Sequence, residues 1–247
     1  MEISKAEFKL INALDTSHGR KKNGAFLVEG PKMIDELLKT KLNIFILAAT
    51  NEWIDNNPTF QSFPQLRNIS PAALQRGSQF STANQVLAVV EIPPQMPFVF
   101  ENQEFVLVLD TIQDPGNLGT IVRTAEWFGI NKILCSIETA DAYNPKVVQA
   151  SMGSVFRVDI FYQNLEKTLK EIQGQVSIYG SLLDGENMHQ MKLQKHGFLV
   201  IGNESKGISE PIKKLISHKI YIPHAANSKA ESLNASVATG ILLSHFN

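Results

Sequence analysis

The side chains of Asn117 and Arg123, an amide and a guanidinium, come shortly after an apolar run of the sequence. Phe105–Leu109 is typical of a buried strand, and the segment Asp114–Ala125 after it begins a helix. That segment contains Asn117 and Arg123, and Gly119 lies on the same helical face as the arginine, four residues before it. In α/β proteins, ligands bind where a strand ends and a helix begins. We therefore expect Arg123 to be exposed and to contact a ligand, with the glycine leaving room for its approach.

Two further apolar runs end in polar segments of the same kind. Phe198–Ile201 runs into Gly202–Ser209, where two glycines permit a sharp turn and Glu204 supplies a carboxylate. Lys219–Ile222 is followed by a loop that ends in Ser232–Ser236. A glycine turn or a serine cap is a common structural feature by itself. Because three such strand ends occur in one half of the chain, we predict a shared ligand site.

The sequence also limits which ligands this site can bind. A crevice at the ends of parallel strands usually binds a nucleotide-like molecule. However, no strand is followed by G-x-G-x-x-G, and G-x-x-x-x-G-K-[ST] is absent. A nucleoside without a pyrophosphate therefore fits better than NAD or ATP. A metabolic nucleotide-binding enzyme of the doubly wound class remains as an alternative.

Composition excludes several classes of protein. The formal net charge of −1 argues against a protein that coats nucleic acid over its whole surface. The single cysteine, Cys135, allows neither an intrachain disulfide nor a thiolate metal site; we predict no metal, and a buried strand position for this residue. The first residues lack the apolar core of a signal peptide, and no apolar run approaches the roughly 20 residues that span a bilayer. We expect a reduced, cytoplasmic protein with no membrane partner.

The elements that must position these residues alternate between strand and helix. Three prolines mark an extended linker at residues 92–98, between an N-terminal domain at 1–91 and a C-terminal domain at 99–247. In the C-terminal domain we predict strands at Phe105–Leu109, Lys132–Ser136, Ser154–Ile160, Ser177–Ser181, Phe198–Ile201 and Lys219–Ile222. Helices are predicted there at Leu118–Phe128, Pro145–Ala150, Leu165–Gln173, Glu210–Ile216 and Leu233–Phe246. This alternation predicts an α/β fold with a mostly parallel sheet.

The N-terminal domain shows a weaker alternation of the same kind. We predict helices at Lys5–Leu14 and Pro31–Lys39, and strands at Gly24–Glu29, Asn43–Ala48 and Val86–Glu91. We therefore expect this smaller domain to be α/β as well.

The three polar segments resemble, in order, the signature motifs of the SpoU-type RNA ribose 2′-O-methyltransferases, which belong to the SPOUT superfamily. The matching stretches are Asn117-x-Gly119-x-x-x-Arg123-Thr124-Ala125, Gly202-Asn203-Glu204-x-x-Gly207 and Ile222-Pro223…Ser232-Leu233-Asn234-x-Ser236. The resemblance covers residues 104–247. The stretch Arg20-Lys21-Lys22-x-Gly24-x-Phe26-Leu27-Val28-Glu29-Gly30 is similar to the ribosomal-protein-like α/β domain that binds substrate in this family.

The resemblance implies a fold, a cofactor and a partner. It implies a deep trefoil knot in the C-terminal domain, S-adenosylmethionine as cofactor, and a homodimer. The cofactor-binding positions of the family are Gly202, Ile222 and Leu233 here, and the positions of its catalytic site are Asn117, Arg123, Glu204, Ser232 and Asn234. The substrate would be RNA, with ribosomal RNA favoured over tRNA by analogy with other two-domain members.

The chemistry of Arg123 is open. Transfer of a methyl group from a sulfonium is an in-line displacement, so alignment of the reacting atoms supplies much of the catalysis. The ribose 2′-hydroxyl must also lose its proton, but a guanidinium with a pKa above about 12 is a poor base. Our hypothesis is that Arg123 binds a phosphate next to the ribose and stabilises the developing alkoxide.

Two further predictions concern a loop that departs from the family pattern and a cluster of basic residues near the N-terminus. The loop Pro223–Ser232 is about two residues longer than is usual in the family and lacks its Met and Gly, which predicts altered cofactor binding; His224 is expected to fill the space of the methionine. This departure favours the alternative of a non-catalytic RNA-binding member with impaired cofactor binding. For the basic cluster Arg20, Lys21 and Lys22, a solvated loop is the default interpretation. Because their domain is joined to an RNA-modifying domain, we predict instead that these residues contact RNA phosphates.

Overall fold

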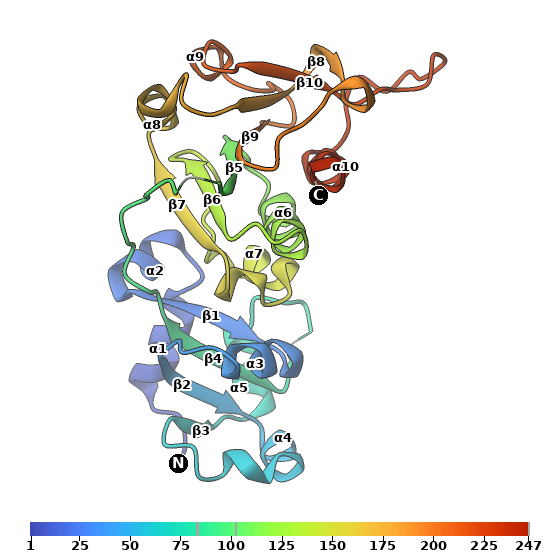
Figure 1. Ribbon diagram of the computed structural model, residues 1–247. Coiled ribbons are helices and arrows are strands. Elements are labelled where there is room, and N and C mark those ends of the chain that lie inside the picture. Colours follow the sequence, from blue (N-terminus) through green and yellow to red (C-terminus); the bar gives the residue numbers. More distant parts are fainter. Residues whose placement is uncertain (83, 102, 247) are drawn as a thin grey trace. The chain divides into compact units, whose positions relative to one another are not determined.

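The computed structural model describes residues 1–82, 84–101 and 103–246, which fold into two compact units (Figure 1). The first unit comprises Met1–Pro94 and Tyr143–Phe156, and the second comprises Gln95–Ala142 and Arg157–Asn247. The division after Pro94 falls within the linker predicted at 92–98. Nothing in the sequence indicates that residues 143–156 belong to the first unit.

Within the described residues, the first unit contains a mixed four-stranded sheet in the order β1-β4-β2-β3. Its strands are β1 (Ala25–Glu29), β2 (Ile44–Ala49), β3 (Leu66–Asn68) and β4 (Val86–Glu91). Strands β1 and β2 are antiparallel to β4, whereas β3 is parallel to β2. Its helices are α1 (Lys5–Ala13), α2 (Ser17–Asn23), α3 (Pro31–Leu38), α4 (Asn51–Asn56), α5 (Pro71–Gly77) and α7 (Pro145–Ser151). The predicted α/β character of this half is confirmed.

Helix α7 belongs to the first unit because aromatic residues beside it pack against β1. The ring of Phe26, in β1, lies 4.5 Å from that of Tyr143 and 6.2 Å from that of Phe156 (centroid distances). All five residues of β1 are buried. Contact of two half-buried aromatic side chains with the buried ring of Phe26 is one of the larger packing contributions that a segment of this length can make.

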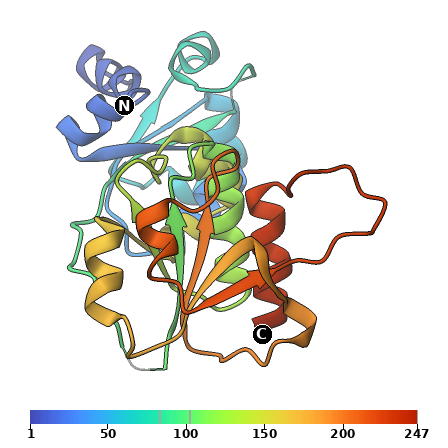
Figure 2. The same ribbon diagram turned by 90° about the horizontal axis from the view of Figure 1, so that it is seen from above.

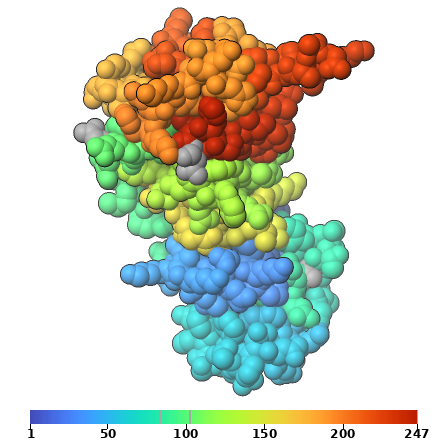
Figure 3. Space-filling model, turned by 45° about the vertical axis from the view of Figure 1, so that its right-hand side comes forward, coloured from blue at the N-terminus to red at the C-terminus, as the bar shows by residue number. Residues whose placement is uncertain are grey.

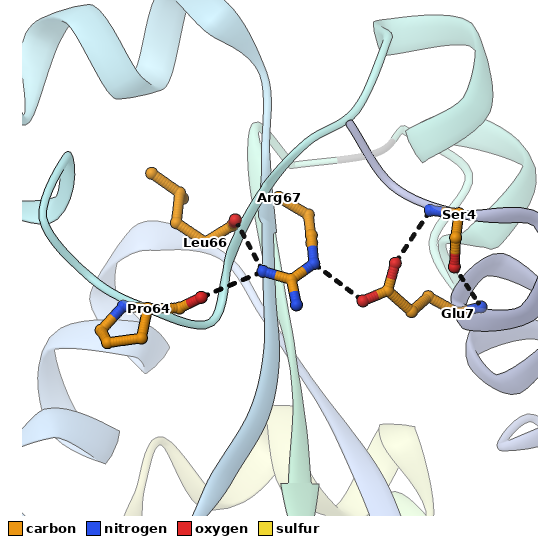
Figure 4. Close-up of polar contacts among 5 residues, drawn as sticks. All are labelled: Ser4, Glu7, Pro64, Leu66 and Arg67. Atoms are coloured by element: carbon orange, nitrogen blue, oxygen red, sulfur yellow. Dashed lines mark hydrogen bonds and ion pairs between the residues drawn. The ribbon is translucent and has the colours of Figure 1, made fainter. Parts of the chain in front are cut away.

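One carboxylate ties the start of α1 to β3 (Figure 4). The Glu7 N–H donates to Ser4 Oγ (3.2 Å) and the Ser4 N–H donates to Glu7 Oε2 (2.8 Å), which forms a capping box. Arg67 Nε donates to Glu7 Oε1 (2.7 Å), and Arg67 Nη1 donates to the carbonyls of Pro64 (3.1 Å) and Leu66 (3.0 Å). Burial raises the pKa of Glu7, but the hydrogen bonds from Ser4 and Arg67 outweigh it, so the pKa is lowered overall. This stabilisation is therefore present at neutral pH and is lost as the pH falls through the lowered pKa.

In the described part of the second unit, six strands form one parallel sheet in the order β10-β8-β9-β5-β6-β7. The strands are β5 (Phe105–Asp110), β6 (Lys132–Ser136), β7 (Asp159–Gln163), β8 (Ile178–Asn187), β9 (Gly197–Gly202) and β10 (His218–Tyr221). The predicted parallel α/β fold is confirmed, and Cys135 is buried in β6 as expected. Burial also raises the pKa of its thiol, which makes it a poor nucleophile.

Helices cover both faces of this sheet. They are α6 (Pro115–Trp127), α8 (Leu165–Ile172), α9 (Glu210–Lys213) and α10 (Ala235–Phe246). Apolar residues of α8 and α9 share a core with β5, β6 and β9. Helices α6 and α10 pack against each other on the opposite side, as Figures 1 and 2 show. Among the helices of the described residues, none has the length and apolar character that crossing a bilayer requires.

Several predicted elements differ from the structure: α9 ends at Lys213 rather than Ile216, and β8 extends to Asn187 rather than Ser181. The strand expected at Ser154–Ile160 is wrong: Ser154–Phe156 is a 3₁₀ turn, and β7 begins only at Asp159. The cause is the left-handed backbone of Met152 (φ 50°) and of the glycine after it (φ 92°), which turns the chain before Ser154. Helix α10 begins at Ala235 rather than Leu233, because the Asn234 side chain caps it.

Candidate active site

The first two motifs begin side by side. Strands β5 and β9 are neighbours in the sheet, and their register pairs Asp110 with Gly202, the last residue of each strand. Both strands run in the same direction, so the segments that follow them emerge at one edge. This edge is where α/β folds bind ligands.

Hydrogen bonds between side chains join all three motifs. Asn117, on α6, donates from Nδ2 to Glu204 Oε1 (2.8 Å), in the loop after β9. Asn234, at the start of α10, donates from Nδ2 to Asn117 Oδ1 (2.9 Å). These residues are 87 and 117 positions from Asn117 in the sequence. Three of the predicted site residues are therefore in contact, and Asn117 is the one in the middle.

Helix caps fix the two asparagines. Asp114 accepts a hydrogen bond from the Asn117 N–H at its Oδ1 (2.7 Å), which starts α6. Asn234 Oδ1 accepts from the Ser236 N–H (2.9 Å), which starts α10 and leaves its Nδ2 to point at Asn117. Helices α6 and α10 also pack together, so both side chains are held by rigid elements.

Arg123 is exposed on α6, as predicted. Within residues 1–82, 84–101 and 103–246 its side chain has no hydrogen bond or ion pair. Gly119 is buried in α6, which packs against α10. The guanidinium is therefore available to a ligand from the solvent side of α6.

The predicted cofactor residues lie at the same edge of the sheet. Gly202 ends β9, and Ile222 follows β10 directly; both are half-buried. Because β8 lies between β9 and β10, these two residues are not on neighbouring strands. A Cβ at Gly202 would lie 2.3 Å from the Gly207 carbonyl carbon and the Ile208 nitrogen, so only glycine fits where the chain folds back. Leu233 precedes α10 and is 47 % exposed.

The loop between β10 and α10 extends away from the rest of the second unit (Figures 2 and 3). Every residue from His224 to Asn234 is exposed, including Ser232. His224 therefore does not fill a buried space as predicted: its ring lies 5.8 Å from that of Tyr221 (centroid distance), and its Nδ1 is 2.9 Å from the Ala225 carbonyl oxygen.

The predicted basic cluster is divided between the interior and the surface. Residues 20–22 lie in α2 rather than in a loop, and Arg20 is only 2 % exposed. Its Nη1 donates to the carbonyls of Leu14 (2.9 Å) and Asp15 (2.8 Å), where α1 ends. Lys21 and Lys22 are exposed. In this conformation Arg20 has almost no surface to offer an RNA phosphate, whereas the two lysines do.

The sequence reading missed a second polar cluster at this edge. Asp110 is 4 % exposed, and its Oδ2 accepts a hydrogen bond from the Ser209 N–H (2.7 Å). Asn203 Nδ2 donates to the Thr111 carbonyl (2.8 Å). The only sign of this cluster in the sequence is that Asp110, an acidic residue, ends an apolar run. The spacing of residues does not indicate its partner Ser209, which lies 99 positions away.

Both halves of the chain match known families. Residues 104–244 match the SpoU rRNA methylase family, and residues 5–88 match the MRM3-like substrate binding domain.

Relatives and solved structures extend these matches over the whole chain. The chain is 31 % identical over 237 residues to the 23S rRNA (guanosine(2553)-2′-O)-methyltransferase RlmP of Bacillus subtilis, which covers 94 % of this chain and 92 % of that protein. A putative RNA methyltransferase of the TrmH family from Porphyromonas gingivalis has a similar structure, with a TM-score of 0.88, 33 % identity, and coverage of 100 % of this chain and 98 % of the other. The structure of an AdoMet-bound rRNA methyltransferase from Sinorhizobium meliloti is also similar, with a TM-score of 0.84 and 26 % identity. The match covers 100 % of this chain and 97 % of the other. The chain belongs to the SpoU rRNA methylase family.

Proposed function

We infer that this chain is an enzyme that transfers a methyl group from S-adenosylmethionine to a ribose 2′-hydroxyl of RNA. The observation that carries this inference is the contact of Asn117 with both Glu204 and Asn234, which brings the three motifs to one edge of the sheet. The relatives support it: one is named as a 23S rRNA 2′-O-methyltransferase, and one solved structure contains AdoMet.

In this proposal Arg123 and Glu204 contact the RNA, and Asn117 orients Glu204. Arg123 is exposed and unpaired among the described residues, so its planar fork of donors can bind a phosphate and stabilise negative charge on the ribose oxygen. One oxygen of Glu204 accepts the hydrogen bond from Asn117, which leaves Oε2 to accept one from the ribose hydroxyl. Asn117 uses both its oxygen and its nitrogen within the protein.

The residues proposed to hold the cofactor suit a nucleoside. When bound, S-adenosylmethionine supplies an electrophilic methyl group on a sulfonium. Gly202, Ile222 and Leu233 would bind it. The main-chain N–H of Leu233 has no hydrogen-bond partner in the described part of the chain, and its apolar side chain is exposed. A purine needs this combination, because it has an apolar face and a polar edge.

The finer parts of the proposal concern substrate, assembly, topology and location. We favour ribosomal RNA over tRNA because a substrate-binding domain of the MRM3-like kind precedes the catalytic half. A homodimer is supported by exposed apolar side chains on the paired helices α6 and α10: Trp127 is 84 % and Val237 is 50 % exposed. The trefoil knot and a cytoplasmic location remain predictions.

A methylation assay tests the proposal. Purified protein is incubated with S-adenosylmethionine that carries a labelled methyl group and with protein-free ribosomal RNA or tRNA from cells that lack the gene. We expect label in ribosomal RNA, at a ribose that becomes resistant to alkaline cleavage. Calorimetry with S-adenosylmethionine alone tests the alternative of a non-catalytic RNA-binding member, which the exposed loop His224–Asn234 favours. Absence of both label transfer and cofactor binding would support that alternative.

A further inference from the structure

The backbone of Thr111 is in a conformation that its side chain disfavours. Thr111 follows β5 directly and has a φ of 63°. For a β-branched residue this left-handed region is a true outlier. Strained backbone of this kind persists only where the surroundings hold it, and it clusters at functional sites.

The left-handed turn aims both main-chain groups of Thr111 at partners. Its N–H donates to Ser136 Oγ (3.1 Å), at the end of β6, and its carbonyl accepts from Asn203 Nδ2 (2.8 Å). Ser136 Oγ also lies 3.2 Å from Thr139 Oγ1, whose hydroxyl donates to the Leu109 carbonyl (3.2 Å). One residue thus joins the end of β6 to the loop after β9.

Asp110 holds the other end of that loop. Its Oδ2 accepts from the Ser209 N–H (2.7 Å), and its Oδ1 accepts from Thr111 Oγ1 (3.1 Å). Between these anchors the loop closes on itself: the Asn203 N–H donates to the Gly207 carbonyl (3.0 Å), and the Gly207 N–H donates to the Asn203 carbonyl (2.9 Å). The loop is therefore fixed near both ends by two consecutive residues.

We propose that Asp110 and Thr111 are positioning residues that fix the loop Gly202–Ser209, so that the Gly202 main chain meets the cofactor and Glu204 meets the ribose. The proposal rests on the function inferred above. Neither residue touches substrate in this mechanism; both act through the loop. The strain at Thr111 is the cost of directing its carbonyl at Asn203 rather than along β5.

Substitutions at Thr111 separate positioning from simple structural support. Thr111→Gly removes the strain and the side-chain bond to Asp110. We expect an unchanged or higher Tm, together with a fall in kcat/KM of about tenfold, since one hydrogen bond of a positioned loop corresponds to about that factor. Thr111→Asn is the matched control, because asparagine tolerates the left-handed region and its side-chain amide can donate to Asp110 in place of the lost hydroxyl; it should retain activity within about twofold.

Substitutions at Asp110 test the second anchor. Asp110→Asn keeps an oxygen for the Ser209 N–H and an amide that can bond to Thr111 Oγ1, so we expect near-normal activity. Asp110→Ala should weaken binding of S-adenosylmethionine about tenfold in calorimetry. Hydrogen exchange at residues 203–209 should become faster in Asp110→Ala and in Thr111→Gly, and stay unchanged in Arg123→Ala.

The outcomes distinguish this proposal from the proposed function. If the wild-type protein methylates no RNA but exchange of residues 203–209 responds as described, the methyltransferase assignment fails and the loop anchoring stands. If Thr111→Gly lowers Tm and activity together, the role is structural and the proposal is overturned. It is also overturned if both Thr111 variants have wild-type kcat/KM and wild-type exchange of the loop. If Asp110→Ala does not fold, Asp110→Asn and Thr111→Gly still decide the matter.

Discussion

The two edges of the parallel sheet differ in what their polar groups bind. At the carboxyl edge, Asn117 contacts residues from two other motifs, and further along the same helix Arg123 is exposed with no partner in the described chain. At the amino edge there is a cavity of about 500 Å³ beside the starts of β5 and β6. There, Lys132 Nζ lies 2.9 Å from Glu104 Oε2 and 3.6 Å from Glu101 Oε1, and it donates to the Val99 carbonyl (3.0 Å).

The difference between the two edges shows that the volume of a cavity does not identify the reactive site. The amino-edge cavity is lined by acidic and basic side chains, and its lysine at residue 132 is neutralised by two carboxylates. The carboxyl edge has convergent amides and a carboxylate, and the helix that begins there carries Arg123, whose guanidinium has no partner among the described residues. Chemistry needs groups that can exchange partners, and these lie at the carboxyl edge.

The largest effect should come from the free cation. Arg123→Lys keeps the charge but loses the planar fork, so we expect turnover to fall tenfold or more, with a larger loss in Arg123→Ala. Tm should stay unchanged in both, because the side chain is exposed and has no partner among the described residues. Steady-state kinetics of methyl transfer and a thermal melt provide the two measurements.

The arginine result bears directly on the comparison of the edges. Near-normal turnover in Arg123→Lys would show that charge without fork geometry is sufficient. A pH–rate profile that shifts in Arg123→Lys would instead support proton abstraction at this position, since lysine titrates within reach of alkaline assays and arginine does not.

The next effect tests the contact between the motifs. Asn117→Asp keeps an acceptor for Asn234 but places a carboxylate against Glu204. We expect turnover to fall about fivefold, because repulsion between like charges in contact displaces Glu204. Thr120→Ala is the matched control: Thr120 is exposed on the same helix, and within the described residues its side chain donates only to the Gly116 carbonyl of that helix. Equal rates for the two variants would contradict a role for Asn117.

The strands of the sheet and the motif residues could be predicted from the sequence, but the hydrogen bonds that connect the motifs could not. Buried parallel strands read as apolar runs, which is why β5, β6 and β9 were predicted almost to the residue. A left-handed backbone at Thr111 has no signal, because threonine rarely adopts it. The bond from Asp110 to Ser209 spans 99 positions and depends on the pairing of strands that the sequence does not specify.

The basic cluster shows a second limit of sequence reading. Arg20, Lys21 and Lys22 are equivalent as letters, but α2 has seven residues and no apolar stripe from which to assign its faces. The structure turns Arg20 onto the end of α1 and leaves the lysines outside. A buried, hydrogen-bonded cation and two exposed cations thus lie within a single turn of helix.

A smaller effect tests that separation. Replacing Lys21 and Lys22 with alanine should weaken RNA binding several-fold and reduce the slope of log K against log salt by about 1.5, as loss of two phosphate contacts does. Tm should change little, because both side chains are exposed. Arg20→Ala should do the reverse, lowering Tm while leaving the salt slope intact. Filter binding at several salt concentrations measures the slope, and an unchanged slope in the double variant contradicts RNA contact by α2.

The smallest effect on activity is expected at the amino edge. The hydrogen bond to Glu104, together with the attraction of Glu104 and Glu101, raises the pKa of Lys132 and outweighs burial, which lowers it. Because the folded-state pKa lies above the unfolded value of about 10.4, this stabilisation is present below that pH and is lost as the pH rises through the folded pKa.

Lys132→Met should therefore lower stability by about 1 kcal/mol at pH 7 and leave the rate of methyl transfer unchanged. The difference in Tm between this variant and the wild type should shrink above about pH 10.4. A loss of methyl transfer in Lys132→Met with an intact fold would mean that the cavity takes part in the reaction, and the contrast between the two edges of the sheet would then be wrong.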